Sequence, residues 1–205
     1  MKTLRLLWPA LGFVAIGHAA TSEADRFEAV KTRLASAECV RLDFVNVIHS
    51  DIFDVVDSTF GSACLASDGR YRVRLGDDTY LYDGTDLHSY SRENNQVVIE
   101  AVNADSEAFS EVRFLTHLEE FFETQPQSSA NSYRLLRRRD SVGDLPDSMT
   151  VIIHSEKLQI DRLEFFDIND EFNTIELLHQ QLDSVCTEVD FIPNFPDSVE
   201  TVKMP

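Results

Sequence analysis

Residues whose side chains could do chemistry are present in this 205-residue sequence, but they do not form a recognisable catalytic motif. His49-Ser50-Asp51 contains the residue types of a nucleophilic triad, yet three consecutive residues do not adopt the spaced geometry that a triad needs. The six histidines show no metal-ligand spacing. The sequence also lacks a G-x-S-x-G elbow and a phosphate-binding glycine loop. We therefore expect no catalytic residues, no metal site and no cofactor.

Carboxylates are abundant because the chain is acidic, with 36 Asp and Glu against 18 Lys and Arg. The run from Asp167 to Glu171 begins like a calcium loop, but Phe172 stands where that loop requires glycine, so we interpret the run as a hairpin turn. A hydrolase with two carboxylates brought together by folding stays an alternative, because their separation in space is not visible in a sequence. The formal charge of −18 argues against binding to nucleic acid or to anionic lipid.

The first twenty residues indicate export. Lys2 and Arg5 form a basic start, residues 6–17 are apolar, and small residues follow, which is the pattern of a secretory signal peptide. We predict a signal peptide over residues 1–19 and a single domain over residues 20–205. The apolar run is not followed by the cysteine of a lipoprotein signal. Removing Lys2 and Arg5 leaves 16 basic and 36 acidic residues, a formal charge of −20.

Three cysteines remain in the expected mature chain. Cys39 lies in the first predicted strand and Cys64 in the second, and a hairpin turning near Asp51-Ile52 would place them opposite each other on one face. An oxidising compartment permits a disulfide there. We therefore predict a Cys39–Cys64 bridge and a buried, unpaired Cys186.

Hydrophobic periodicity predicts a sheet with few helices. Ser22 can cap a helix over residues 22–37, in which apolar side chains recur at helical spacing. Strict alternation then predicts strands at residues 39–46 and 57–66. Asp-Gly and Asn-Asn pairs punctuate residues 60–100 as hairpin turns, which predicts a meander with strands at residues 70–75, 79–82, 87–91 and 96–101.

The second half contains one amphipathic helix and more strands. Apolar residues step by three or four over residues 105–124, which predicts a helix that is either ordinary core packing or a movable lid. Strands are predicted at residues 133–137, 149–154, 158–166, 173–182 and 188–192, with an irregular tail. The predicted class is mainly β with helices (α+β): a curved antiparallel, partly open β-barrel of about eleven strands with a helical lid.

Four stretches resemble the periplasmic outer-membrane lipoprotein carrier family (LolA-like). They are a Phe-containing strand at residues 42–46, a Gly-led strand running into an aromatic strand at residues 61–72, a D-G-x-x-L-x-x-Y-x-x-x-x-x-Q segment, and a terminal F-x-x-x-x-P-x-x-V pattern. The third is matched by Asp83, Gly84, Leu87, Tyr90 and Gln96, and the fourth by Phe191, Pro196 and Val199. Each motif is short, and together they cover most of the mature chain.

The resemblance implies a function. Such a protein is a periplasmic carrier that shields the acyl chains of lipoproteins in an apolar cavity and takes them from the inner to the outer membrane. Its partners would be acylated lipoproteins, an inner-membrane lipoprotein-releasing transporter and an outer-membrane acceptor lipoprotein, and we expect a monomer. The alternative is a lipid- or peptide-sensing envelope-stress regulatory domain on the same fold.

The residues that would serve this function are assigned from the side of the predicted sheet or helix on which each side chain is expected to lie. The expected acyl cavity is lined by Val40, Leu42, Phe44, Tyr71, Val73 and Leu75. The expected lid consists of Phe109, Val112, Leu115 and Leu118. The family's usual Arg-Pro before the aromatic strand is replaced here by Ser67-Asp68, so no lid-gating residue is assigned.

Overall fold

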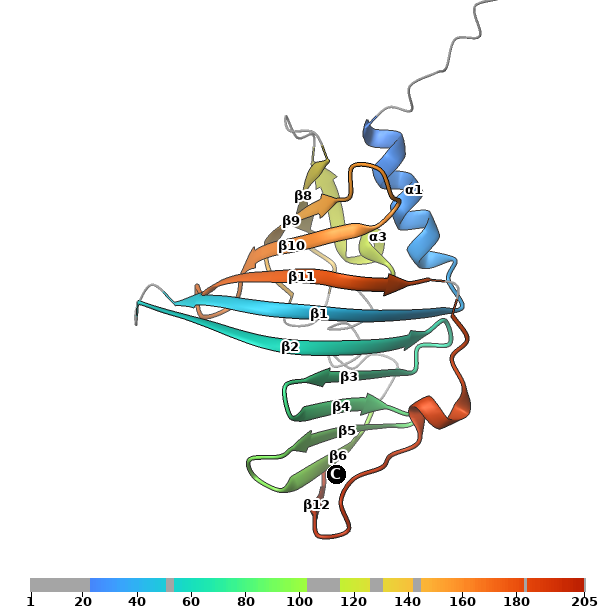
Figure 1. The fold of residues 1–205 in the computed structure, drawn as a ribbon, viewed down its shortest axis with the longest axis vertical. Coiled ribbons are helices and arrows are strands. Elements are labelled where there is room, and N and C mark those ends of the chain that lie inside the picture. The colour runs from blue at the N-terminus through green and yellow to red at the C-terminus, as the bar shows by residue number, and fades with distance from the viewer. Residues whose placement is uncertain are drawn as a thin grey trace, which may run out of the picture.

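The computed structural model describes residues 23–50, 54–102, 115–125, 131–141, 145–182 and 184–204. Within these ranges the chain forms one twelve-stranded sheet whose order is β12-β6-β5-β4-β3-β2-β1-β11-β10-β9-β8-β7 (Figure 1). The sheet is open, because β12 and β7 lie at its two ends. The predicted class, a mainly β fold with a partly open barrel and few helices, is confirmed. The predicted signal peptide lies outside the described residues.

The N-terminal elements are a helix and a long hairpin. Helix α1 (Glu23–Ala35) turns its apolar stripe toward the core, with Phe27 and Val30 each only 1% exposed. Strands β1 (Cys39–Ser50) and β2 (Val55–Ala66) pair antiparallel over their whole length. The hairpin is longer than predicted and projects at one end of the molecule (Figure 1).

The predicted meander is confirmed, and its strands are β3 (Tyr71–Leu75), β4 (Asp78–Tyr82), β5 (Asp86–Ser91) and β6 (Gln96–Ala101). Each pairs antiparallel with the next. The turns use residues with positive φ, such as Gly84 at 104° and Asn95 at 46°. A positive φ is accessible to glycine and tolerated by asparagine, which explains why these local signals predicted the turns correctly.

The second half of the chain extends the sheet on the other side of β1. Its elements are the short helix α3 (Leu118–Phe121) and the strands β7 (Phe122–Gln125), β8 (Ser132–Arg137), β9 (Ser148–Ile153), β10 (Ile160–Phe166) and β11 (Phe172–Gln181). Strand β11 pairs antiparallel with β1, so the two halves meet in the middle of the sheet. The predicted turn after β10 is confirmed, with Asp170 at φ 60°.

Three predicted elements are corrected. Of the helix expected over residues 105–124, residues 105–114 lie outside the described residues, and in the rest only Leu118–Phe121 is helical, because residues 122–125 form β7, which pairs with β8 from Phe122↔Arg137 onward. Residues 188–192 are not a strand: η2 (Glu188–Phe191) is a 3-10 helix whose Asp190 carboxylate accepts a hydrogen bond from the Thr187 amide. The tail is not wholly irregular, because β12 (Glu200–Lys203) pairs parallel with the open edge of β6.

The two faces of the sheet carry separate hydrophobic clusters. We call the face that includes Val40 and Leu42 the inner face, and the opposite face the outer face. The inner face packs with α1 and α3 into the main core, which also includes Tyr133, Leu135, Met149, Val151 and Leu163. The outer face carries a smaller cluster of Cys39, Cys64, Leu81 and Phe191, with Ala66 and Cys186 packed against it.

Candidate functional site

The residues predicted to line the acyl cavity lie together on the inner face of β1 and β3. Val40, Leu42 and Tyr71 are buried, at 1%, 5% and 6% exposure. Phe44 and Val73 are partly buried and pack against the same core, whereas Leu75 is half-buried and lies outside that cluster. The alternation in the sequence thus assigned the correct face, because successive side chains of a strand point to opposite sides.

Helix α1 covers the β8–β11 end of the inner face. The Phe27 ring stacks on the Tyr133 ring, with centroids 4.3 Å apart and an interplanar angle of 11°. Arg26 donates hydrogen bonds to the backbone carbonyl of His154 at 3.0 Å and to the side chain of Asn131 at 3.3 Å. These contacts fix α1 to the loops of β8 and β9.

The predicted lid is described only in part. Phe109 and Val112 lie outside the described residues. Leu118, in α3, is 2% exposed in the main core, and Leu115 packs against the same core. The backbone amide of Arg138 donates a hydrogen bond of 2.8 Å to the carbonyl of Phe121, which joins the end of α3 to β8.

A close contact joins β1 and β2 on the inner face. Phe44 and Gly61 are directly paired across the two strands, and the Phe44 ring lies over the glycine, in the space that a Cβ atom would occupy. A glycine inside a strand often marks such a close approach. Phe44, one of the predicted cavity residues, can therefore hold its ring in this position only because residue 61 has no side chain.

The D-G-x-x-L-x-x-Y segment builds the β4–β5 turn. Oδ1 of Asp83 accepts hydrogen bonds of 2.9 Å from the backbone amides of Thr85 and Asp86, and its Oδ2 lies 2.9 Å from Nε2 of the buried His88. Burial by itself would raise the pKa of Asp83, but these hydrogen bonds together lower it below its usual value. The motif is thus accounted for by turn geometry.

The segment also packs both faces of the meander. Leu87 contacts the main core, whereas Tyr90 stacks on Phe195, with ring centroids 5.3 Å apart. Phe191 of the terminal pattern is 3% exposed in the outer cluster. The third and fourth of the four stretches described above therefore meet in the structure, where residues 191–196 pack on the outer face of β4 and β5.

Asp68, where the family usually has proline, holds Arg70. The Arg70 guanidinium donates to the Glu188 carboxylate through two hydrogen bonds of 2.6 and 3.1 Å, and to Asp68 at 2.9 Å. Glu188 first, and then Asp68, raises the pKa of Arg70 above its usual value. The Arg70–Glu188 pair ties the β2–β3 turn to η2, and Asp68 holds Arg70 in place for it.

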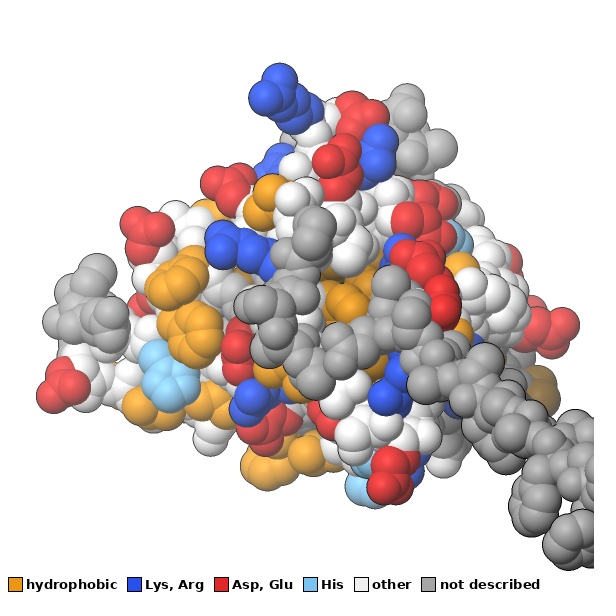
Figure 2. Space-filling model, turned by 90° about the horizontal axis from the view of Figure 1, so that it is seen from above, with side chains coloured by type: hydrophobic (Ala, Val, Ile, Leu, Met, Phe, Trp, Pro, Cys, Tyr) orange, Lys and Arg blue, Asp and Glu red, His pale blue; other side chains and the backbone are white. Residues whose placement is uncertain are grey.

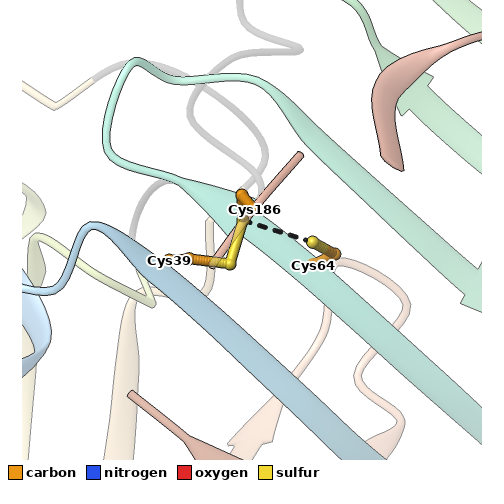
Figure 3. Close-up of side chains that lie close together, drawn as sticks. All are labelled: Cys39, Cys64 and Cys186. Carbon is orange, nitrogen blue, oxygen red and sulfur yellow. Dashed lines mark hydrogen bonds between the residues drawn. A yellow bond between two sulfur atoms is a disulfide. The ribbon is translucent and has the colours of Figure 1, made fainter. Parts of the chain in front are cut away.

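The predicted Cys39–Cys64 disulfide is wrong. Cys39 is joined to Cys186, with an S–S distance of 2.04 Å, and Cys64 is a buried free thiol (Figure 3). The β1–β2 register places Cys39 opposite Ala66, two residues beyond Cys64. Cys39 and Cys64 therefore share a face but sit diagonally, where Cα atoms are about 7–8 Å apart, which is too far for a disulfide.

The three cysteines are also the cluster of potential metal ligands found within the described ranges, with ligand atoms all within 4.8 Å of one another. Metal ions bind the thiolate form of cysteine. Because Cys39 and Cys186 are joined as a disulfide, this cluster offers one thiol in the state seen here.

Sequence reasoning missed two adjoining pockets on the outer face, with volumes of about 350 and 550 Å³. Both are lined by Arg72 and Arg74, the first also by Arg41 and the second by Arg92. Three of these arginines have polar partners. Arg41 lies 2.9 Å from Asp190, and Arg92 lies 2.7 Å from Asp77. Arg72 donates a hydrogen bond to the backbone carbonyl of Ile192. The alternation of Arg70, Arg72 and Arg74 with Tyr71, Val73 and Leu75 was the available signal.

Hydrophobic side chains gather at the end where the β1–β2 and β10–β11 hairpins project, on the left in Figure 2. Exposed members include Val56 at 63%, Phe166 at 58% and Ile168 at 75%. His49 and Phe166 both contact the Phe172 ring, at centroid distances of 5.9 and 5.2 Å. In the part of the chain that is described, no helix is both long and apolar enough to cross a bilayer.

Comparison with known proteins adds information on the fold. The sequence matches no protein-family profile and no curated protein. An uncharacterized conserved protein from Thermus thermophilus is similar in structure, with a TM-score of 0.52 and 11% identity over 89% of this chain and 97% of that chain.

Two further structures have lower scores. A LolA superfamily protein from Nitrosomonas europaea has a TM-score of 0.45 and 9% identity over 85% of this chain and 99% of that chain. A putative outer membrane lipoprotein-sorting protein domain from Vibrio parahaemolyticus has a TM-score of 0.44 and 9% identity over 83% and 97% of the two chains. At such identities, what this chain shares with the Thermus protein is its fold.

Proposed function

We propose that this protein is a periplasmic carrier that binds the acyl chains of lipoproteins against the inner face of its sheet. The observation that supports this proposal is the position of the expected cavity residues. Five of the six belong to or pack against a single apolar cluster, and within the described residues that cluster is covered by α1 and α3 and by no second sheet. A sheet face covered by short elements can be uncovered without unfolding the strands.

The need for such a face follows from the cost of exposing lipid to water. Burying acyl methylenes is worth about 0.8 kcal/mol each, so a sixteen-carbon chain left in water costs roughly 12 kcal/mol. A carrier that crosses the aqueous periplasm must therefore supply an equivalent apolar contact. Release would then require an acceptor with higher affinity, because the sequence provides no nucleotide site for a hydrolysis-driven step.

Loading would require part of the inner cover to move, because Val40, Leu42 and Tyr71 are buried in this structure. Helix α1 is held by the Arg26 hydrogen bonds and the stack of Phe27 on Tyr133. The segment containing Leu115 and Leu118, together with the preceding residues, is thus the better candidate for the lid.

The proposal is tested by measuring binding of a diacylated lipopeptide to the mature protein by native mass spectrometry. The same peptide without acyl chains is the ligand control. We expect one acylated peptide per protein and no binding of the unacylated form. Equal binding of both peptides, or of neither, would refute the acyl-binding proposal.

A matched pair of variants locates the site. Val73→Glu places a charge on the inner face of β3, and Phe60→Glu places one on the outer face of β2, where Phe60 is 69% exposed. We expect Val73→Glu to lose the lipopeptide and Phe60→Glu to retain it, with circular dichroism confirming that both variants are folded. Equal loss in both variants would argue against the inner face. The implied transporter and acceptor lipoprotein would be tested once this binding is observed.

A further inference from the structure

Three sulfur atoms lie together on the outer face, where β1, β2 and the C-terminal segment (residues 184–204) meet. Sγ of Cys64 lies 3.4 Å from Sγ of Cys186, which is bonded to Sγ of Cys39 at 2.04 Å (Figure 3). All three sulfurs lie within 4.8 Å of one another. A free thiol is therefore in contact with a disulfide that the carrier function does not use.

We propose that these cysteines form a thiol–disulfide exchange site, in which the Cys64 thiolate attacks Sγ of Cys186 and displaces Cys39. One S–S bond forms between Cys64 and Cys186 as the Cys39–Cys186 bond breaks, so the step consumes no oxidant or reductant. The proton lost by Cys64 is balanced by the proton that Cys39 takes up. The inference is independent of the acyl-binding function.

The geometry selects Cys186 as the attacked sulfur. Sγ of Cys186 lies 3.4 Å from Sγ of Cys64, and Cys186 belongs to a segment outside the β1–β2 ladder. Cys39 and Cys64 sit diagonally within that ladder, a position that a disulfide does not span without backbone movement. Attack at Cys39 would have to form this unfavourable pair, whereas attack at Cys186 does not.

One feature slows the reaction at rest. Burial raises the pKa of the Cys64 thiol, an effect that the nearby Arg41 opposes. Because the thiolate is the reactive form, exchange accelerates as pH rises.

Exchange would change the anchor of the C-terminal segment and the exposure of the free thiol. Cys39 and Cys64 sit diagonally on neighbouring strands, so the attachment point of Cys186 would move by about 7–8 Å. The free thiol would move from Cys64, which lines the 350 Å³ outer pocket, to Cys39, which is 0% exposed. A thiol reagent that enters this pocket would then meet no accessible free thiol.

Disulfide mapping of the mature protein tests the proposal. The protein is incubated at about pH 7 and about pH 9, blocked with N-ethylmaleimide, digested without reduction and analysed by mass spectrometry. We expect a Cys64–Cys186 peptide to form beside Cys39–Cys186, about tenfold faster per pH unit below the thiol pKa. Cys39 should become alkylated, after denaturation, in the same proportion.

Two variants control the experiment. Cys64→Ser keeps the Cys39–Cys186 bond and should show that pair alone at both pH values. Cys39→Ser leaves Cys64 and Cys186, and we expect them to form a disulfide with each other. A wild-type map that contains Cys39–Cys186 alone at the higher pH, or that contains Cys39–Cys64, would overturn the proposal. The disulfide map of the wild-type protein tests the proposal even if one of the variants does not fold.

Discussion

The contact between Phe44 and Gly61 gives a quantitative test of the inner face. In Gly61→Ala, the new Cβ would overlap Cζ of Phe44, and would lie 2.5 Å from Cε2 of that ring and 2.9 Å from the carbonyl oxygen of Arg74. The Phe44 ring must therefore move, and the β2–β3 ladder must adjust slightly. Overpacking of this kind costs about 1–3 kcal/mol.

A smaller effect acts in the opposite direction. Replacing glycine by alanine restricts the unfolded chain and by itself stabilises by about 0.4–1 kcal/mol. We therefore expect Gly61→Ala to lower the free energy of unfolding by about 1–2 kcal/mol. In a Phe44→Leu background two of the three close contacts disappear, because leucine has no Cζ or Cε2 atom. The penalty of Gly61→Ala should then fall by about 1 kcal/mol.

Urea unfolding followed by far-UV circular dichroism measures these free energies, because the sole tryptophan, Trp8, lies in the predicted signal peptide. A loss of about 1–2 kcal/mol corresponds to a midpoint shift of roughly 0.5–1 M urea. Phe165→Leu is the control background, since Phe165 packs against the same core from β10. An equal cost of Gly61→Ala in the wild-type and Phe44→Leu backgrounds, or a gain in stability, would contradict steric overlap with the Phe44 ring as the cause.

Three other changes have expected outcomes. Cys186→Ser should lower the free energy of unfolding by up to about 5 kcal/mol, because the native bond spans 147 residues, and dithiothreitol should lower it in wild type but not in the variant. Phe27→Ala should cost about 3–5 kcal/mol in urea unfolding, since the buried ring stacks on Tyr133; retention of wild-type stability would contradict the role of α1. Asp83→Ala should cost about 1–3 kcal/mol by leaving two backbone amides without their acceptor. The pKa of Asp83 is lower in the folded protein than in the unfolded chain, so its contribution to the free energy of unfolding is complete above about pH 4 and is lost as pH falls through the folded pKa. The difference in stability between wild type and Asp83→Ala should therefore shrink in acid. A difference that persists below the folded pKa would contradict this.

Local signals predicted the parts of the fold that local chemistry controls. Turn residues such as Gly84 and Asn95 adopt the positive φ that their types favour, so the meander was predicted nearly strand by strand. Ten of the eleven predicted strands correspond to strands of the structure, and alternation placed five of six cavity candidates on one apolar cluster. Strand β12 was missed because it is short and forms against the edge of a partner distant in sequence, whereas β7 was missed because its residues were assigned to the helix predicted over residues 105–124.

The helix predicted over residues 105–124 shows how pairing overrides periodicity. Phe121 and Phe122 fit a helical stripe, but they belong to different elements, because the backbone after Phe121 pairs with β8. Both rings are buried, one in a helix and one in a strand. A period of three to four therefore identified buried residues correctly without identifying their secondary structure.

Composition and pattern alone determined that this chain is an acidic, mainly β protein whose apolar residues alternate along its strands. The tertiary structure decided which cysteines are joined, because Cys186 reaches Cys39 only after the C-terminal segment crosses the outer face. It also decided the contacts of Arg70 with Glu188 and of Phe44 with Gly61. Turns and strand faces depend on neighbouring residues, whereas these contacts depend on strand register and on chain segments that meet only after folding.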